Sequence, residues 1–219
     1  MKLRQRFLDQ ISQTPGVSDE RPLGSGPPNR HGMPKLPVGQ RQTAPGKWPV
    51  LDIGRQPRIS VTEWELLVDG ECRNSLQFDW QTFMRLEQVE DDSDFHCVTG
   101  WSKLDTRWRG VRFSSLAALA EPTENAHFVV CYGYDNYTTN LPLAEALKDD
   151  VLLVHTADGA PLAYEHGGPL RMITPQLYAW KGAKWIRRIE FTCLDRPGLW
   201  ESNGYSNTAH PWRNDRYAR

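Results

Sequence analysis

The sequence predicts a single α+β domain in which mixed sheets alternate with short helices. Apolar stretches typical of buried strands recur at 127–132, 151–155 and 185–193, and turn residues separate them. A helical pattern at 114–120, before the first of these strands, is stopped after two turns by Pro122. A chain of 219 residues is long enough for one domain with a core and short for two. Short strands mixed with short helices therefore favour the α+β class.

The composition is that of a globular protein and excludes several other classes. Residues of the AVILMFWYC set make up 39% of the chain. The longest apolar runs, 128–132 and 151–154, are far shorter than the roughly 18 residues of a membrane-spanning helix. The net charge of -1 offers no general attraction to nucleic acid or anionic lipid. We therefore expect no nucleic-acid partner and no membrane span.

Both ends of the chain differ in composition from its middle. Residues 1–57 hold nine of the 16 prolines and seven of the 17 glycines, and runs such as 24–28 exclude a regular helix or a central strand. From about residue 196 the chain is again rich in turn residues. We predict an irregular N-terminal arm at 1–47, the domain at 48–195 and a C-terminal extension at 196–219 packed on it.

The expected elements of the domain are short. Asp79 is a candidate N-cap for a helix that carries Phe83, and Ser114 is the candidate cap of the next helix. The remaining elements are strands at 59–68, 94–98, 108–113, 127–132, 151–155, 171–173 and 185–193, and a helix that Pro142 opens and that runs to residue 147.

Four cysteines are spread along the chain without a CxxC pair, at positions 72, 97, 131 and 193. This usage is typical of free thiols in a reducing compartment, although two disulfides are compatible with it. The first ten residues contain neither an apolar stretch nor an Arg-Arg pair of the kind that export signals carry. We therefore expect a cytoplasmic protein.

Cys97 ends a predicted strand and is followed by Val98-Thr99-Gly100. A thiol at such a strand end can face a cleft where the backbone approaches a ligand closely. On spacing alone, however, the favoured reading is a cysteine buried as a small hydrophobic residue. His96 lies on the opposite face of the strand, so a nucleophilic pair with Cys97 has poor geometry.

A second constellation combines a histidine, an arginine and two lysines. His166 and Arg171 are five residues apart, and Lys181 and Lys184 flank the small pair Gly182-Ala183. The planar guanidinium of an arginine can donate two hydrogen bonds to an anion, and a lysine adds a positive charge. A glycine leaves the backbone N–H groups accessible. This combination suits an anion such as phosphate. The alternative is scattered surface charge on a loop.

Taken together, these segments resemble the sulfite oxidase family of molybdenum–molybdopterin oxidoreductases, and most of all its methionine-sulfoxide reductase branch and the cytoplasmic relatives of that branch. The resemblance covers roughly residues 48–195. The segments that carry it, in the order of the family, are Cys97-Val98-Thr99-Gly100-Trp101-Ser102, Trp108-Arg109-Gly110, His166-Gly167-Gly168-Pro169-Leu170-Arg171 and Lys181-Gly182-Ala183-Lys184-Trp185. It implies a sulfite-oxidase-type molybdopterin-binding domain.

The resemblance also implies roles for individual residues. Cys97 takes the position of the thiolate that binds molybdenum, and soft sulfur suits such a metal. Residues 50–53 correspond to a segment that lines the pterin in relatives. The cofactor-binding positions of the family fall on His166, Arg171, Lys181, Gly182, Ala183, Lys184 and, through its backbone alone, Gly133.

The activity implied is oxygen-atom transfer on a small-molecule substrate, with electrons exchanged with an external redox partner protein. Two departures argue against sulfite as that substrate. No arginine follows Cys97 directly, and His155 stands where sulfite oxidases place a tyrosine over the metal, which makes it the second catalytic candidate. A neutral sulfoxide or N-oxide fits better. Alternatives are a cofactor-binding or scaffold module without redox turnover, a sulfite-oxidising enzyme, and a metal-free structural domain.

Overall fold

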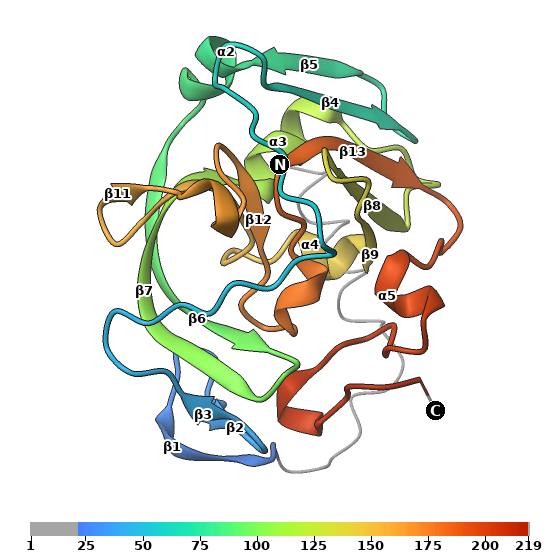
Figure 1. Cartoon of the computed structure of the whole chain (residues 1–219). Helices are drawn as coiled ribbons and strands as arrows, with labels where there is room; N and C mark the ends of the chain where they lie inside the picture. Colours follow the sequence, from blue (N-terminus) through green and yellow to red (C-terminus); the bar gives the residue numbers. More distant parts are fainter. Residues whose placement is uncertain (1–21, 219) are drawn as a thin grey trace.

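The computed structural model describes residues 22–218, which form two mixed sheets linked by short helices (Figure 1). The first sheet has six strands in the order β11-β10-β7-β3, with β12 paired to β10 and β6 paired to β7. The second has five strands in the order β5-β4-β13-β8-β9. In it β13 runs parallel to β4 and antiparallel to β8. The expected α+β architecture of mixed sheets with short helices is confirmed.

The bounds of the strands show how short most of them are. The six-stranded sheet consists of β3 (Arg41–Gln42), β6 (Val89–Cys97), β7 (Trp101–Arg112), β10 (Leu152–Ala157), β11 (Ala160–Pro161) and β12 (Arg171–Ile173). The five-stranded sheet consists of β4 (Glu65–Gly70), β5 (Leu76–Asp79), β8 (Phe128–Gly133), β9 (Thr138–Pro142) and β13 (Ile186–Thr192).

The helices are shorter still. They are α2 (Trp80–Met84), α3 (Phe113–Ala120), α4 (Leu143–Ala146) and α5 (Leu199–Ser202), with single 3₁₀ turns η1 (Tyr164–His166), η2 (Ala179–Lys181) and η3 (Pro211–Arg213). In residues 22–218, no helix has the length and apolarity to cross a lipid bilayer.

The two predicted helix caps have different outcomes. Asp79 caps α2 as expected, because its Oδ1 accepts from the Thr82 N–H at 2.7 Å. The prediction that Ser114 caps the next helix is wrong. Strand β7 runs directly into α3, so the N-cap position is Arg112, two residues before Ser114, and Arg112 makes no side-chain capping bond.

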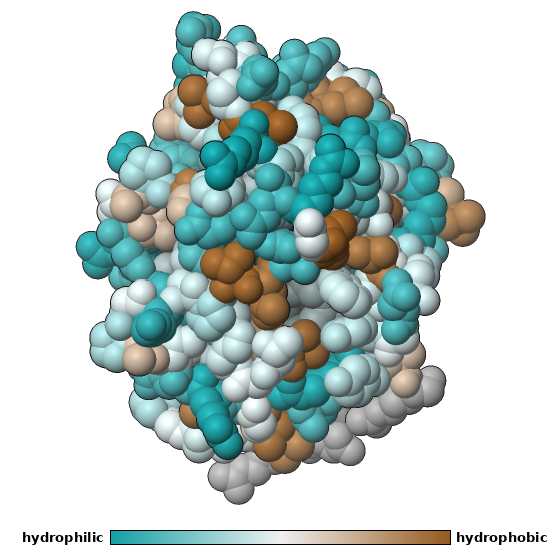
Figure 2. Space-filling model, in the orientation of Figure 1, coloured by the Kyte–Doolittle hydropathy of each residue, from teal (hydrophilic) through white to brown (hydrophobic). Residues whose placement is uncertain are grey.

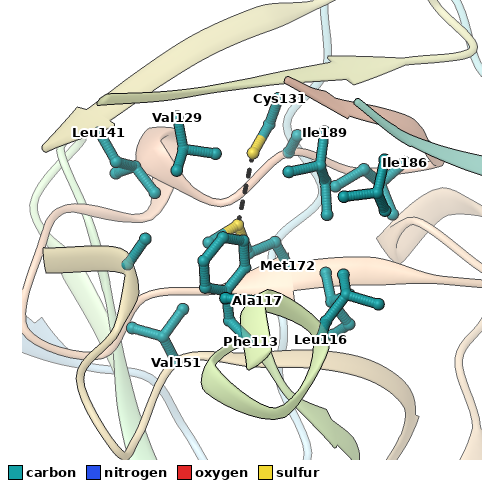
Figure 3. Close-up of a cluster of buried hydrophobic side chains, with 14 of the residues drawn as sticks. Phe113, Leu116, Ala117, Val129, Cys131, Leu141, Val151, Met172, Ile186 and Ile189 are labelled. Carbon is teal, nitrogen blue, oxygen red and sulfur yellow. Dashed lines mark hydrogen bonds between the residues drawn. The ribbon is translucent and has the colours of Figure 1, made fainter. Parts of the chain in front are cut away.

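The core lies between the five-stranded sheet and α3 (Figure 3). Val129, Cys131 and Ile189 point from the sheet toward Phe113 of α3 and Met172 of β12. The Cys131 Sγ lies 3.5 Å from the Met172 Sδ, so this cysteine serves as a small core residue. Because β12 belongs to the other sheet, the same contact joins the two sheets.

The two longest strands fix the position of Cys97. Strands β6 and β7 form an antiparallel pair, shown as long curved strands in Figure 1, and Cys97 pairs with Trp101 at its closed end. The turn 97–100 depends on Gly100, whose φ of 95° lies in the left-handed region that favours glycine. The strand predicted at 94–98 is the last part of β6, which begins five residues earlier than predicted and has Cys97 as its last residue.

The described part of the N-terminal arm packs on the C-terminal extension. The Leu23 N–H donates to the Trp212 carbonyl at 2.8 Å, and the Trp212 indole donates to the Pro34 carbonyl at 2.6 Å. The arm is more regular than predicted, since β1 (Gly24–Pro28) and β2 (Pro34–Pro37) form a separate hairpin. Each strand of a two-stranded sheet is an edge strand, where proline is tolerated. The part of the arm at 1–21 lies outside the described residues.

A buried ion pair attaches the C-terminal extension to the domain. The Lys181 Nζ at the end of η2 lies 2.7 Å from Glu201 Oε1 of α5, and both side chains are essentially inaccessible to solvent. The same ammonium donates to the Asn140 carbonyl at 2.9 Å, while Thr139 and Trp180 donate to the Glu201 carboxylate. The two charges thus pair where β9, η2 and α5 meet, with all of these contacts to the carboxylate made at Glu201 Oε1, while Oε2 has no hydrogen-bond partner within residues 22–218.

Removing one partner of this pair should be costly. Lys181→Met leaves the Glu201 carboxylate buried without a cation, so we expect the free energy of unfolding to fall by about 3–5 kcal/mol in urea denaturation. The matched control is Lys148→Met, whose partner Glu145 lies 2.6 Å away on a partly exposed helix; its cost should stay below about 1 kcal/mol. Equal stability of the two variants would contradict the assignment.

Candidate active site

A cavity of about 290 Å³ opens beside the end of β6. On the face shown in Figure 2, apolar side chains gather around a hollow in the middle of the molecule. Five of the residues predicted from the sequence line this cavity together: Cys97, His166, Arg171, Gly182 and Lys184. They come from β6, η1, β12 and the segment after η2, so the fold joins the two constellations that are about 70 residues apart in the sequence.

Cys97 contributes the thiol of the cavity and is only 7% exposed. Its Sγ lies 3.2 Å from the Thr99 Oγ1, and burial raises the pKa of the thiol above its ordinary value. The thiol is therefore protonated at neutral pH in the free protein. A bound metal ion would replace that proton, because the thiolate is the form that binds metals.

Arg171 is a buried cation without an acidic partner. Its side chain is almost fully buried, and it makes no salt bridge with any residue of the described part of the chain. Its guanidinium donates to the carbonyls of His166 at 2.9 Å and Gly182 at 3.4 Å, and it lies 5.0 Å from the Phe95 ring. Burial lowers the pKa of Arg171 to about 10. An anion in the cavity would supply the missing negative charge.

Lys184 adds a second cation on the same wall. Its Nζ donates to the carbonyls of Leu51 at 2.7 Å and Glu165 at 2.9 Å. Burial, and next to it the charge of Arg171, lower the pKa of Lys184 to about 8, although Asp52 and Asp135 oppose this shift. Two cations whose charged forms are both disfavoured by their surroundings form a site that an anion would stabilise.

His166 presents a neutral imidazole to the cavity. Burial, followed by the neighbouring Arg171, lowers its pKa to about 4. The ring stacks on the Trp48 indole with centroids 3.9 Å apart and planes 8° from parallel. No residue among those described forms a hydrogen bond with the ring nitrogens of His166, so one nitrogen can donate and the other can accept toward a ligand.

The small residues predicted for backbone contacts divide between the cavity and the interior. Gly182 lines the cavity, and a Cβ at this position would lie 2.5 Å from the Met172 carbonyl, so only glycine fits there. Ala183 is fully buried and does not line the cavity. Gly133 does not line it either, since its N–H bonds to Tyr137 and its carbonyl accepts from Arg187.

Two further candidates lie away from the cavity. Lys181, which was expected to assist in cofactor binding, is fully buried in the ion pair with Glu201. The second catalytic candidate, His155, does not line the cavity. Its Nε2 lies 3.0 Å from the Gln88 Oε1, its Nδ1 lies 2.8 Å from the Thr156 hydroxyl, and its ring meets Trp80 edge to face. The structure therefore does not bring His155 to Cys97.

Most of the remaining wall is apolar or aromatic, and sequence patterns identified only part of it. The expectation that 50–53 lines the site agrees with the placement of Leu51, Asp52 and Ile53 on the cavity. No pattern predicted the large residues around them, although nine tryptophans in 219 residues are a general sign of an aromatic interior. These residues are Trp48, Phe95, Trp101, Tyr137, Trp180, Trp200 and Tyr205.

These features fit a molybdopterin carrying its metal. The cavity offers one thiol as a soft metal ligand, two cations without acidic salt-bridge partners for a phosphate, and a neutral imidazole and glycine backbone for polar ring atoms. The aromatic side chains provide a rigid surface for a planar ring system.

Comparisons with known proteins agree with this assignment. The model of the oxidoreductase molybdopterin binding domain matches residues 53–200, which is more than half of the chain. The uncharacterized oxidoreductase YuiH of Bacillus subtilis is 40% identical over 84% of this chain and 92% of its own length.

More distant relatives are longer than this chain. The protein-methionine-sulfoxide reductase catalytic subunit MsrP of Burkholderia mallei is 29% identical, and the match covers 68% of this chain and 52% of the relative. The putative protein-methionine-sulfoxide reductase subunit YedZ1 of Azospira oryzae is 27% identical, with 68% and 56% covered. The chain thus spans about half the length of these two relatives.

A solved structure shares the fold. The crystal structure of the sulfane dehydrogenase SoxCD from Paracoccus pantotrophus superposes with a TM-score of 0.60 at 20% identity, over 68% of this chain and 42% of that chain. The sequence match over 53–200 and the similarity to YuiH establish that this chain belongs to the family of oxidoreductase molybdopterin-binding domains, the sulfite oxidase family that its motifs resemble.

Proposed function

We propose that this chain is an oxidoreductase that uses molybdenum–molybdopterin to transfer an oxygen atom to or from a small neutral oxide of the sulfoxide or N-oxide kind. The observation that carries the proposal is that the Cys97 thiol shares a cavity with the guanidinium of Arg171, which is buried and has no acidic partner among the described residues. A structural domain would gain nothing from burying that cation, whereas a phosphate-bearing cofactor would compensate its charge.

The residues of the cavity have separate roles in this proposal. When bound, the cofactor would supply a metal centre that gives up two electrons as it takes an oxygen atom from an oxide, or gains two electrons in the reverse transfer. Cys97 gives up its proton and holds the metal, while Arg171 and Lys184 hold the phosphate together with the backbone around Gly182. His166, kept neutral and held flat against Trp48, hydrogen-bonds the organic ring.

The surroundings of Cys97 favour a neutral substrate. The three cations that follow Cys97 in the sequence, Lys103, Arg107 and Arg109, do not line the cavity. Lys103 pairs with Asp158 at 2.6 Å and Arg107 with Asp92 at 3.1 Å. Val98, Thr99 and Trp101 line the cavity beside the thiol instead. Once the phosphate of the cofactor occupies Arg171 and Lys184, these three residues offer no further cation to an anion such as sulfite, and a buried charge needs a partner.

The proposal includes an external redox partner and a cytoplasmic location. Oxygen-atom transfer changes the oxidation state of the enzyme by two electrons, so a second protein must supply or remove them. The four free cysteines, of which Cys193 is exposed, support a reducing compartment.

Replacing the sulfur of Cys97 tests the metal site. The protein is produced in a host that makes the cofactor, and molybdenum content, sulfur-to-metal absorption and sulfoxide reduction are measured. Cys97→Ser should lose the absorption band and at least about 100-fold of activity, since even residues that only support a ligand often cost 10–100-fold. The control Cys193→Ser should match the parent protein. A Cys97→Ser protein with full activity would refute the thiolate role.

Turnover assays distinguish the proposal from its alternatives. The loaded protein should reduce sulfoxides or N-oxides with an artificial electron donor and should oxidise sulfite at least about tenfold more slowly. Bound cofactor without turnover of any substrate would instead support a cofactor-binding module. Faster turnover of sulfite than of neutral oxides would support a sulfite-oxidising enzyme.

Anion binding by the cofactor-free protein should depend on pH through Lys184. Sulfate keeps its charge from neutral pH to about pH 9, whereas Lys184, with a pKa of about 8, loses its charge in this range. The affinity measured by calorimetry should therefore fall as pH rises, by about tenfold. The Lys184→Arg protein keeps the charge at this position, so it should bind sulfate equally well at neutral pH and at about pH 9. A parallel fall in both proteins would rule out Lys184 as the cause.

A further inference from the structure

The turn that carries Cys97 is held by residues outside the region that matches the family. Gln40 of the N-terminal arm donates from its Nε2 to the Cys97 carbonyl at 3.0 Å, and the next residue, Arg41, donates its backbone N–H to the Gly100 carbonyl at 2.9 Å. Both donors precede residue 53, where the family match begins. The arm thus binds both ends of the turn 97–100.

The C-terminal extension binds the middle of the same turn. The Arg216 guanidinium donates to the carbonyl of Val98, and its other terminal nitrogen donates to the Gly39 carbonyl at 3.4 Å. It also lies 5.1 Å from the centre of the Tyr178 ring. Arg216 therefore joins the C-terminal extension to the N-terminal arm at the turn, and it makes no ion pair within residues 22–218.

Gln40 is itself held in place by buried hydrogen bonds. It is only 7% exposed, and its Oε1 accepts from the hydroxyl of Ser102, which is fully buried. The Ser102 Oγ in turn lies 2.8 Å from the His96 Nδ1. The amide of Gln40 is therefore fixed on both sides, with its oxygen on β7 and its nitrogen on the turn.

We propose that Gln40 and Arg216 are positioning residues that hold the turn 97–100 so that the Cys97 Sγ points into the cavity. The inference rests on the proposed role of Cys97 as metal ligand. Anchoring the carbonyls of residues 97, 98 and 100 limits rotation of the turn and therefore of the Cα–Cβ bond that directs the sulfur. Residues that orient a metal ligand in this way tune both its affinity and its electronic coupling to the metal.

The accessibility of the thiol tests this role without any cofactor. The full-length protein is purified without cofactor and treated with iodoacetamide, and mass spectrometry compares the alkylation rate of Cys97 with that of the core residue Cys131. Gln40→Leu removes one buried hydrogen bond to the turn, so the ratio of the two rates should rise about tenfold. Cys131 reports opening of the whole domain, so the ratio isolates local movement of the turn.

Matched variants separate positioning from general destabilisation. Gln42→Leu changes an exposed glutamine of β3, two residues after Gln40 in the same arm, and it should leave the ratio unchanged. Arg216→Met should raise the ratio, Arg216→Lys should raise it less because one donor remains, and Arg213→Met should have no effect. If Gln40→Leu does not fold, the Arg216 series gives the same readout. An unchanged ratio in Gln40→Leu or Arg216→Met would overturn the proposal.

The loaded enzyme provides a second readout. Gln40→Leu and Arg216→Met should shift the electron paramagnetic resonance signal of the molybdenum, because the sulfur meets the metal at a different angle, while Gln42→Leu and Arg213→Met should keep the parent signal. Loss of the metal–sulfur signature in Cys97→Ser tests the proposed function separately. If Cys97 binds the metal and neither Gln40→Leu nor Arg216→Met changes the signal, the positioning role is refuted and the proposed function stands.

Discussion

Burial of the Arg171 guanidinium without a carboxylate is the constraint around which the site is organised. The fold compensates this charge only with carbonyl groups and aromatic faces, which are weaker partners than an anion. Burial, and next to it this uncompensated charge, lower the pKa values of Lys184 and His166. The charged form of Lys184 would therefore be stabilised by an anion in the cavity, and His166 stays neutral at neutral pH.

The cavity combines this cationic wall with an aromatic one, and the two suit different parts of one bound assembly. Arg171 and Lys184 lie where charge must be compensated, while Trp101, Trp200 and Tyr205 exclude water without adding charge. In the proposed function, the cations would compensate the phosphate of the cofactor, and the uncharged aromatic residues would meet a neutral substrate. The C-terminal extension contributes to the second wall, so it is part of the site.

The sequence motifs named residues that line the cavity and others that do not. They could not predict the positions of side chains that depend on contacts with distant parts of the chain. Cys97, His166, Arg171 and Lys184 lie in short motifs and were found together in one cavity. Lys181 belongs to the same motif, but its partner Glu201 lies in the extension, and a burial decided by tertiary contact leaves no periodic signal. His155 lies at a shift in the pairing of β10 with β7, between Val154 and Thr156, and a shift of this kind changes where a side chain points.

The buried pair of Lys181 and Glu201 sets a physical limit on how small a working version of this protein can be. The family match ends at residue 200, one position before the carboxylate that neutralises the ammonium. A fragment that ends at residue 200 would retain every cavity residue of β6, η1 and β12. It would lack the carboxylate that pairs with the Lys181 ammonium. The shortest fragment that folds by itself should therefore include Glu201, although the family match ends one residue earlier.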